Sequence, residues 1–283
     1  MPATLSGAPL PALFVSHGAP LFAVDAGSSG PALRAWGTAL RKRHVVRGVV
    51  VMSPHWMAPQ PAVMTHPAPP TWHDFGGFPP ALYALQYAAP GDPALAERVA
   101  ALLAVDGLPV QHDGQRPRDH GAWVPLMHLF PEADIPVVQL ALPVGADPAA
   151  VFRMGRAVRS LRDAGVLLMG TGSMTHNLRE FFGGMPPIDS PPAPYVTAFA
   201  RWVEDAVVRN DREALLDYRS RAPDAVRAHP EDDHFLPLFF ALGASDWAGG
   251  DAVAPAYISR EVMYRMLAMD AFALPAAAAL SQA

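Results

Sequence analysis

The sequence predicts an α/β fold in which a central, mostly parallel or mixed sheet is flanked by helices. Apolar runs of strand length alternate with segments of helical periodicity, and this alternation is typical of such folds. The runs are apolar at nearly every position, as expected for strands buried on both faces. No shift in composition marks a linker, so residues 1–283 are expected to form a single domain. Open α/β sheets bind ligands outside the carboxyl ends of their strands, and we expect the active site there.

Four short runs rich in Val, Ile and Leu, bounded by Gly, Pro or polar residues, are predicted strands: residues 12–15, 45–52, 135–142 and 166–169. The predicted helices between them are residues 32–42, 93–103, 124–130 and 148–163. After Gly170 the pattern is mainly helical, at residues 195–208, 212–218 and 234–242, with a final short run around Tyr257. The C-terminal third is therefore expected to wrap the sheet and close the site.

Proline is concentrated in residues 58–80 and 184–194. These stretches are predicted to be loops, because proline lacks an amide donor and clashes with a preceding helical turn. The first loop carries too many aromatic residues for a solvated linker, and we expect it to form an ordered rim over the site. The aromatic residues expected in this rim are Trp56, Trp72, Phe75 and Phe78.

Composition excludes several classes of protein. The net charge of -5 without a basic stripe argues against nucleic-acid binding. No apolar run approaches the roughly 20 residues of a membrane span, and no secretory signal is visible, so a cytoplasmic location is expected. Zero cysteines leave only nitrogen and oxygen ligands for a metal. The basic run at residues 41–43 is expected at the end of a helix. The sequence does not define the oligomeric state.

Histidine placement gives the functional signal. Of the eleven histidines, His17, His55 and His176 each follow a short apolar run, which predicts that they lie at strand ends. His234 precedes an apolar helical segment. Imidazole is the commonest metal ligand, and neighbouring strands would bring these side chains together. We therefore predict a metal-dependent catalyst.

Other residues compete for roles near this site. His120 lies between Asp119, which could cap the following helix, and Gly121, which lets backbone approach a ligand closely. His229 rivals His234 for the metal, and a carboxylate from residues 231–233 is a further possible ligand. The remaining histidines considered, which lack such context, are assigned surface or packing roles: His44, His66, His112 and His128.

The motifs bear on four alternative functions. The Gly-Thr-Gly-Ser segment at residues 170–173 lacks the lysine of a phosphate-binding loop. Neither Ser16 nor Ser53 lies in a Gly-x-Ser-x-Gly elbow, so a serine hydrolase is not supported. A zinc-dependent hydrolase, in which three histidines hold the metal that activates water, remains the main alternative. The fourth alternative is a metal-binding protein without catalysis.

The sequence resembles the class III extradiol ring-cleavage dioxygenases of the LigB superfamily, in particular the DOPA 4,5-dioxygenase branch, over nearly the whole chain. The segments that carry the resemblance are Leu13-Phe14-Val15-Ser16-His17-Gly18-Ala19-Pro20, Ser53-Pro54-His55-Trp56, His73-Asp74-Phe75-Gly76-Gly77-Phe78-Pro79, Asp119-His120-Gly121-Ala122-Trp123, His176-Asn177-Leu178 and His234-Phe235-Leu236-Pro237-Leu238. Together these motifs are specific, and the Phe-Gly-Gly-Phe-Pro loop is the most distinctive of them.

The resemblance implies an enzyme that opens the ring of a small catechol with O2 and yields a semialdehyde. It implies a non-haem Fe(II) bound by His17, His55 and His234, where many relatives have Glu in place of the last ligand. Three neutral imidazoles also suit Zn(II), so the purified protein could carry zinc.

The resemblance also distributes the other roles. His176, with an ordinary pKa near 6.5, would act as acid and base. His120 would hydrogen-bond the developing anion or bound O2. We further expect His229 to contact the substrate.

Overall fold

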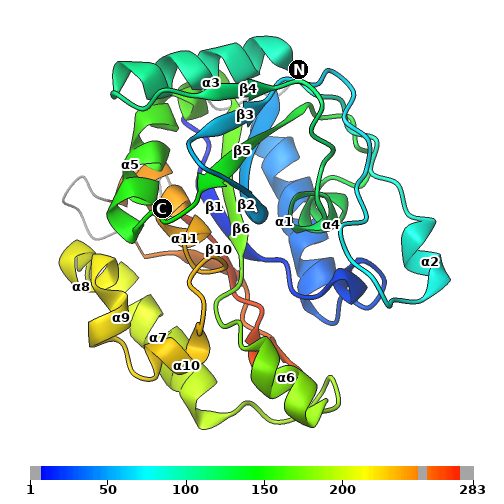
Figure 1. Cartoon of the computed structure of the whole chain (residues 1–283), viewed down its shortest axis with the longest axis vertical. Helices are drawn as coiled ribbons and strands as arrows, with labels where there is room; N and C mark the ends of the chain where they lie inside the picture. Colours follow the sequence, from blue (N-terminus) through cyan, green and yellow to red (C-terminus); the bar gives the residue numbers. More distant parts are fainter. Residues whose placement is uncertain (1–7, 248–253, 275–283) are drawn as a thin grey trace.

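A computed structural model describes residues 8–247 and 254–274 (Figure 1). Within these residues eight strands form one mixed sheet, in the order β4-β3-β5-β2-β6-β1-β10-β7. The four central strands run parallel to their neighbours within this group. They are β1 (Ala12–Ser16), β2 (Gly48–Ala58), β5 (Val137–Pro143) and β6 (Val166–Gly172). These correspond to the four predicted strands, which confirms the predicted fold class.

The strands outside this central group are short, and sequence periodicity does not reveal them. Strand β3 (Ala62–Met64) runs antiparallel to β5, and β10 (Ala271–Leu274) runs antiparallel to β1. Because β3 lies within residues 58–80, the prediction that this stretch is all loop is wrong. The remaining strands are β4 (Gln111–Asp113), β7 (Ala256–Ser259), which contains Tyr257, and the separate pair β8 (Val262–Met263) and β9 (Leu267–Ala268).

Helices cover both faces of the sheet (Figure 1). One face carries α1 (Ser29–Arg43) and α4 (His120–Leu129), and the other carries α3 (Pro93–Val105), α5 (Pro148–Val158) and α11 (Pro237–Ala244). The basic residues at 41–43 form the last turn of α1, as predicted. Several predicted helices differ in their bounds, and α4, for example, begins at His120 rather than at residue 124.

Helix α5 gives way to a 3₁₀ segment, η2 (Arg159–Ala164), where the sequence predicts one continuous helix. Helix α11 begins at Pro237 rather than at residue 234. Proline is favoured in the first helical turn, where its missing amide has no intrahelical partner to lose. His234 consequently lies in the turn that precedes α11.

The C-terminal third supplies short helices beyond one end of the sheet (Figure 1). They are α6 (Leu178–Gly184), α7 (Pro194–Val208), α8 (Arg212–Leu216), α9 (Tyr218–Arg221) and α10 (Ala225–Ala228), so the helix predicted at 212–218 is divided. Short segments η1 (Pro20–Ala23) and α2 (Pro80–Tyr83) complete the described helices. No helix in the described ranges is long and apolar enough to cross a membrane.

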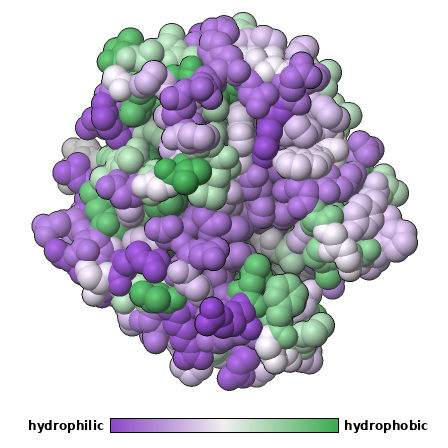
Figure 2. All heavy atoms as spheres, viewed as in Figure 1, coloured by the Kyte–Doolittle hydropathy of each residue, from purple (hydrophilic) through white to green (hydrophobic). Residues whose placement is uncertain are grey.

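Helix α6 differs from the other helices of this group in having no buried residue. Leu178, Phe182 and the adjacent Met185 are exposed. Figure 2 shows the corresponding apolar surface at the lower right, over α6. Helix α6 begins two residues after His176, so this apolar surface follows a predicted site residue directly along the chain.

Glycines allow α11 to approach both α5 and the sheet. A Cβ at Gly155 of α5 would overlap the Phe240 carbonyl, and a Cβ at Gly243 would overlap the Phe152 carbonyl. A Cβ at Gly172, the last residue of β6, would overlap the carbonyl of His234. The close approach at residue 172 requires glycine there, so a bound phosphate is not needed to account for it. The same approach brings His234 to the end of β6.

We predict that Gly155→Ala destabilises the protein by about 1–3 kcal/mol, the usual cost of forcing atoms into a packed interior. The added methyl group meets helix backbone, which cannot rotate aside as a side chain can. The measurement is chemical unfolding followed by circular dichroism. Gly183→Ala in α6 is the control, because a Cβ there meets nothing within 4 Å. Equal stability of the two variants would contradict the predicted close packing.

Candidate active site

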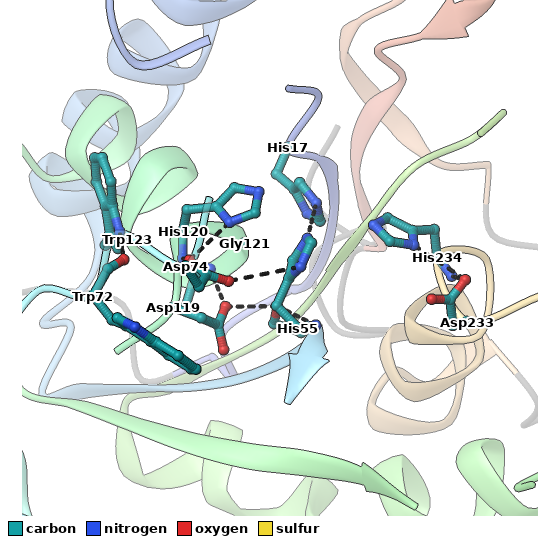
Figure 3. Close-up of polar contacts among 12 residues, drawn as sticks. His17, His55, Trp72, Asp74, Asp119, His120, Gly121, Trp123, Asp233 and His234 are labelled. Atoms are coloured by element: carbon teal, nitrogen blue, oxygen red, sulfur yellow. Dashed lines mark hydrogen bonds and ion pairs between the residues drawn. The ribbon is translucent and has the colours of Figure 1, made fainter. Parts of the chain in front are cut away.

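Five imidazoles meet near the carboxyl ends of β1, β2 and β6. The ring centroid of His17 lies 5.0 Å from that of His55 and 5.4 Å from that of His234. His120 lies 4.0 Å from His55, and His176 stacks on His234 at 3.7 Å. Figure 3 shows His120 and His234 approaching the His17–His55 pair from opposite sides. The structure therefore brings together five of the six histidines predicted for the site.

His17 follows β1 and is held in one orientation by a chain of hydrogen bonds. Its Nδ1 lies 3.0 Å from Thr171 Oγ1 on β6, and the Thr171 hydroxyl donates to the Gly121 carbonyl at 2.8 Å. Because the hydroxyl has one proton, its oxygen accepts from His17 Nδ1–H. The lone pair of His17 therefore lies on Nε2, which is 3.1 Å from His55 Nε2.

Gly121 makes room for this pair of imidazoles. A Cβ at this position would lie 2.7 Å from His55 Cδ2 and 3.2 Å from His17 Cε1, and it would overlap Ser53 Oγ. The sequence indicates that Gly121 permits a close approach, and the structure shows that the approaching groups are side chains of the site.

His55 lies within β2, whereas the sequence predicts it at a strand end. The register of β2 against β5 shifts between Ser53 and Met57, so a bulge presents His55 toward the cluster. Pro54 lacks the amide that a regular ladder needs. The bulge is fixed by two bonds: the His55 amide donates to Ser53 Oγ at 3.2 Å, and Arg116 donates to the His55 carbonyl at 2.8 Å.

A buried carboxylate, Asp119, joins this bulge to α4. It accepts hydrogen bonds from Ser53 Oγ at 2.8 Å, from Gln139 Nε2, and from the Ala122 amide at 3.2 Å. The last bond caps α4, as predicted. Burial raises the pKa of Asp119, and the Gln139 hydrogen bond offsets part of that rise.

Asp74 orients His120. Its Oδ1 accepts from both the backbone amide and Nδ1 of His120 at 2.9 Å, which leaves His120 Nε2 unengaged by this carboxylate. Its Oδ2 lies 3.7 Å from His55 Nδ1 (Figure 3). Burial alone would raise the pKa of Asp74, but the hydrogen bonds and charge of His120 outweigh it and lower that pKa. Asp74 is therefore a carboxylate at neutral pH.

Backbone contacts place the stacked pair on the opposite side. The His234 carbonyl accepts from the Ser173 amide at 2.8 Å, and the His176 amide donates to the Ala228 carbonyl at 2.8 Å. His234 Nδ1 is buried and lies 3.1 Å from Asp233 Oδ1, without the alignment of a hydrogen bond. One ring nitrogen of His234 is thus inside the protein without a satisfied partner.

Burial keeps three of the clustered imidazoles, those of His17, His55 and His176, neutral in the metal-free protein. Burial, and then the neighbouring His55, holds the pKa of His17 well below its ordinary value, and burial followed by His120 does the same for His55. Burial and then His234 lower the pKa of His176 to about 2. The expectation that His176 has an ordinary pKa is therefore wrong, because the sequence does not show its burial. Neutral imidazoles have the lone pairs that metal ligands and proton acceptors need.

His229 is the predicted site residue that does not join the cluster. Its Nε2 lies 2.9 Å from the Met174 carbonyl, and its ring packs 5.5 Å from Phe199 and 4.9 Å from Phe235. The side chain is fully buried. This position supports a packing role rather than the predicted contact with substrate.

The predicted aromatic rim is divided between two places. Phe75 packs edge-on against His120 at 5.5 Å, and Phe78 packs against Phe75 at 5.3 Å, so this part lies at the site. Trp56 and Trp72 do not join it. Their rings lie 5.1 Å and 4.7 Å from the Arg116 guanidinium, and they hold the arginine that fixes the bulge.

Sequence reasoning assigned no role to Thr171, Asp74 or Arg116. Asp74 lies inside a motif that carries the resemblance, and its position there was an available signal. Thr171 lies in the Gly-Thr-Gly-Ser segment, which was considered only as a phosphate loop. Arg116 gives no local signal, because its partner His55 is 61 residues away along the chain.

The donor set fits a metal ion. The His17 and His55 Nε2 atoms are 3.1 Å apart, and two nitrogens bound to one ion through bonds of about 2.0–2.1 Å lie about 3 Å apart. Nitrogen atoms of His17, His55 and His120 all lie within 4.8 Å of one another. His234 supplies a further imidazole from the other side (Figure 3). The arrangement forms a candidate metal site in which His17 and His55 supply two ligands and either His120 or His234 supplies the third.

The family to which the chain belongs accounts for this site. Residues 11–266 match the catalytic LigB subunit of aromatic ring-opening dioxygenase, and the match covers most of the 283 residues. The chain is therefore a member of the LigB family. Taken with the relatives described next, it is an extradiol ring-cleaving dioxygenase.

Two curated relatives and one solved structure are similar over most of the chain. The 4,5-DOPA dioxygenase extradiol of Beta vulgaris is 41% identical, covering 82% of this chain and 85% of its own length. That of Escherichia coli strain K12 is 36% identical, covering 88% and 89%. The crystal structure of the uncharacterized protein JW3007 from Escherichia coli K12 has a TM-score of 0.71 at 28% identity, covering 94% of this chain and 100% of that one. These similarities confirm the predicted family and activity.

We predict that Thr171→Val lowers the affinity for a divalent metal about 10- to 100-fold, the usual effect of removing a hydrogen-bond partner of a ligand histidine. Valine keeps the shape but leaves His17 Nδ1–H and the Gly121 carbonyl without partners. Calorimetric titration of metal-free protein with Zn(II) measures the change. Thr171→Ser, which keeps the hydroxyl, should retain most of the affinity. Unchanged affinity in the valine variant would show that this bond does not orient His17.

Proposed function

We propose that the enzyme holds a non-haem Fe(II) ion through His17, His55 and His234, and that zinc can occupy the same ligands. The observation that carries the proposal is the 3.1 Å approach of two Nε2 atoms, one of which has its lone pair fixed by Thr171. Three neutral imidazoles leave the full charge of the ion to attract an anionic catecholate. His234, with its buried and unaligned Nδ1, completes a set drawn from three separate segments of the chain.

We propose a small catechol with a DOPA-like side chain as the substrate, with O2 as the second reactant. Support comes from the two relatives named as 4,5-DOPA dioxygenases, whose similarity extends over more than four fifths of both chains. Phe75 contacts His120 of the cluster and Phe78 packs against Phe75, so this pair offers an apolar surface that suits an aromatic ring. The bound ion would supply Lewis-acid binding of the catechol oxygens and the redox chemistry that O2 needs.

Two histidines that are not in the proposed ligand set would handle protons and charge. His176 stacks on His234 at 3.7 Å, which places its imidazole at the edge of the proposed ligand set, where it would accept a catechol proton and later return it. His120 is oriented by Asp74 through Nδ1, which leaves Nε2 for a hydrogen bond to a developing anion or to O2. Phe75 covers His120 and limits the access of water to the reacting groups.

The decisive experiment compares metals under controlled oxygen. Metal-free protein loaded anaerobically with Fe(II) should consume O2 when DOPA or a related catechol is added. Mass spectrometry should find both atoms of the consumed O2 in the ring-opened product. Protein loaded with Zn(II) should be inactive, because zinc has no redox step to offer. Zinc-dependent turnover of esters or amides under argon would instead support the hydrolase.

The third ligand can be identified by metal stoichiometry. We predict that His17→Ala, His55→Ala and His234→Ala each lose tight binding of one equivalent of metal, whereas His120→Ala keeps it. His120 is the matched control because its nitrogen also lies within 4.8 Å of the first two ligands. Elemental analysis after dialysis gives the result, with circular dichroism to check folding. Loss of metal from His120→Ala and its retention by His234→Ala would reverse the assignment.

For His176 we predict that His176→Ala and His176→Phe keep the metal and bind catechol, yet lose roughly 10²- to 10⁴-fold in turnover. This is the usual contribution of a positioned proton-transfer group. Metal content, catechol binding by absorption difference, and steady-state O2 uptake are measured on the same preparations. Metal loss in either variant, or near-normal turnover with metal bound, would exclude the proton-transfer role.

A further inference from the structure

A second pocket lies between α7 and the C-terminal strands, apart from the histidine cluster. Its volume is about 270 Å³. One wall is formed by α7, and the other by the segments that contain β8, β9 and the start of β10. The polar residues that line it are Thr197, Arg201, Glu204, Arg260 and Asp270.

Asp270 is the unusual member of this lining. It is only 6% exposed, and none of its hydrogen bonds or ion pairs joins its carboxylate to another described residue. Burial raises the pKa of this carboxyl to about 7, and the charge of Arg260 offsets only part of the rise. The other deeply buried carboxylate, Asp119, is met by Ser53, Gln139 and a helix amide. Buried carboxylates are normally satisfied in this way, and among the residues that the structure describes the Asp270 carboxylate has no such partner.

Arg260, a cation in the lining of the same pocket, is bound to other residues. Arg260 donates to Glu204 Oε2 at 2.6 Å, and its guanidinium lies 3.5 Å from the centre of the Tyr257 ring. It therefore neutralises Glu204 and reaches Asp270 only through its long-range charge. Arg201 forms no ion pair within the described ranges, and Thr197 offers a hydroxyl to the same pocket.

We propose that this pocket binds a small primary ammonium compound, whose –NH₃⁺ group donates to the Asp270 carboxylate. An ammonium group has three donors and no acceptor, which matches one unpartnered carboxylate and a neighbouring hydroxyl. A divalent ion fits poorly, because calcium and magnesium need about six oxygen ligands, and the unpartnered oxygen groups that line this pocket are one carboxylate and one hydroxyl. An anion would meet Asp270 directly.

The pocket is separate from the candidate metal site but adjoins its framework. The backbone carbonyl of Asp270 accepts from the Ser16 amide at 3.1 Å and from Ser16 Oγ at 2.9 Å, and Ser16 immediately precedes His17. Asp270 thus lines the pocket, while its backbone carbonyl binds Ser16, the residue before His17 of the cluster. Binding can be measured without the metal, so failure here would leave the proposed function untouched.

The test is a titration of metal-free protein with propylammonium chloride at pH 8, where Asp270 is ionised, by calorimetry. Wild-type protein should bind one equivalent saturably. Asp270→Asn should weaken binding about 10-fold or more, the effect of losing a hydrogen bond between charged groups. Asp163→Asn, which removes a carboxylate from η2, should leave binding unchanged. Ala200→Leu, which fills the pocket from α7, should also abolish binding and serves if Asp270→Asn does not fold.

Tetramethylammonium chloride and potassium chloride are the ligand controls. Neither cation carries an N–H donor, so both should bind at least about 10-fold more weakly than propylammonium. The proposal is overturned by the absence of saturable binding to wild-type protein, by equal affinity for tetramethylammonium, or by full affinity in a folded Asp270→Asn variant.

Discussion

The hydrogen-bond chain from His17 through Thr171 to Gly121 is the constraint on which the rest of the site depends. It joins the end of β1, strand β6 and the first turn of α4, and each bond requires the next, because a hydroxyl has only one proton to give. It fixes the lone pair of His17 on Nε2. The same helix turn has glycine where a Cβ would overlap the site, so α4 can lie against the imidazoles.

Two buried carboxylates, Asp119 and Asp74, position His55 and His120. Asp119 has hydrogen bonds from Ser53, Gln139 and the Ala122 amide, and it secures the bulge that presents His55. Asp74 contacts His120 directly and brings a negative charge within 3.7 Å of His55. Losing a partner of either would leave a buried charge unsatisfied, which is a more costly change than losing an exposed ion pair.

The two sides of the cluster are built differently. On the α4 side, His120 is held by a carboxylate and covered by Phe75. On the α11 side, His234 and His176 stack face to face and are positioned by backbone bonds, beside the exposed apolar surface of α6. This asymmetry suits separate roles in proton transfer and in stabilising negative charge.

The sequence by itself determined the four central strands and the three clustered histidines that follow apolar runs, because these runs and the residues after them are local features. The motifs in addition determined the family. Only the tertiary structure decided that His55 lies in a bulge, that His229 packs among phenylalanines, and that the pKa of His176 is low. It also selected Thr171 as the partner of His17, 154 residues away. Burial and hydrogen-bond partners arise from contacts between distant segments, and no local pattern records them.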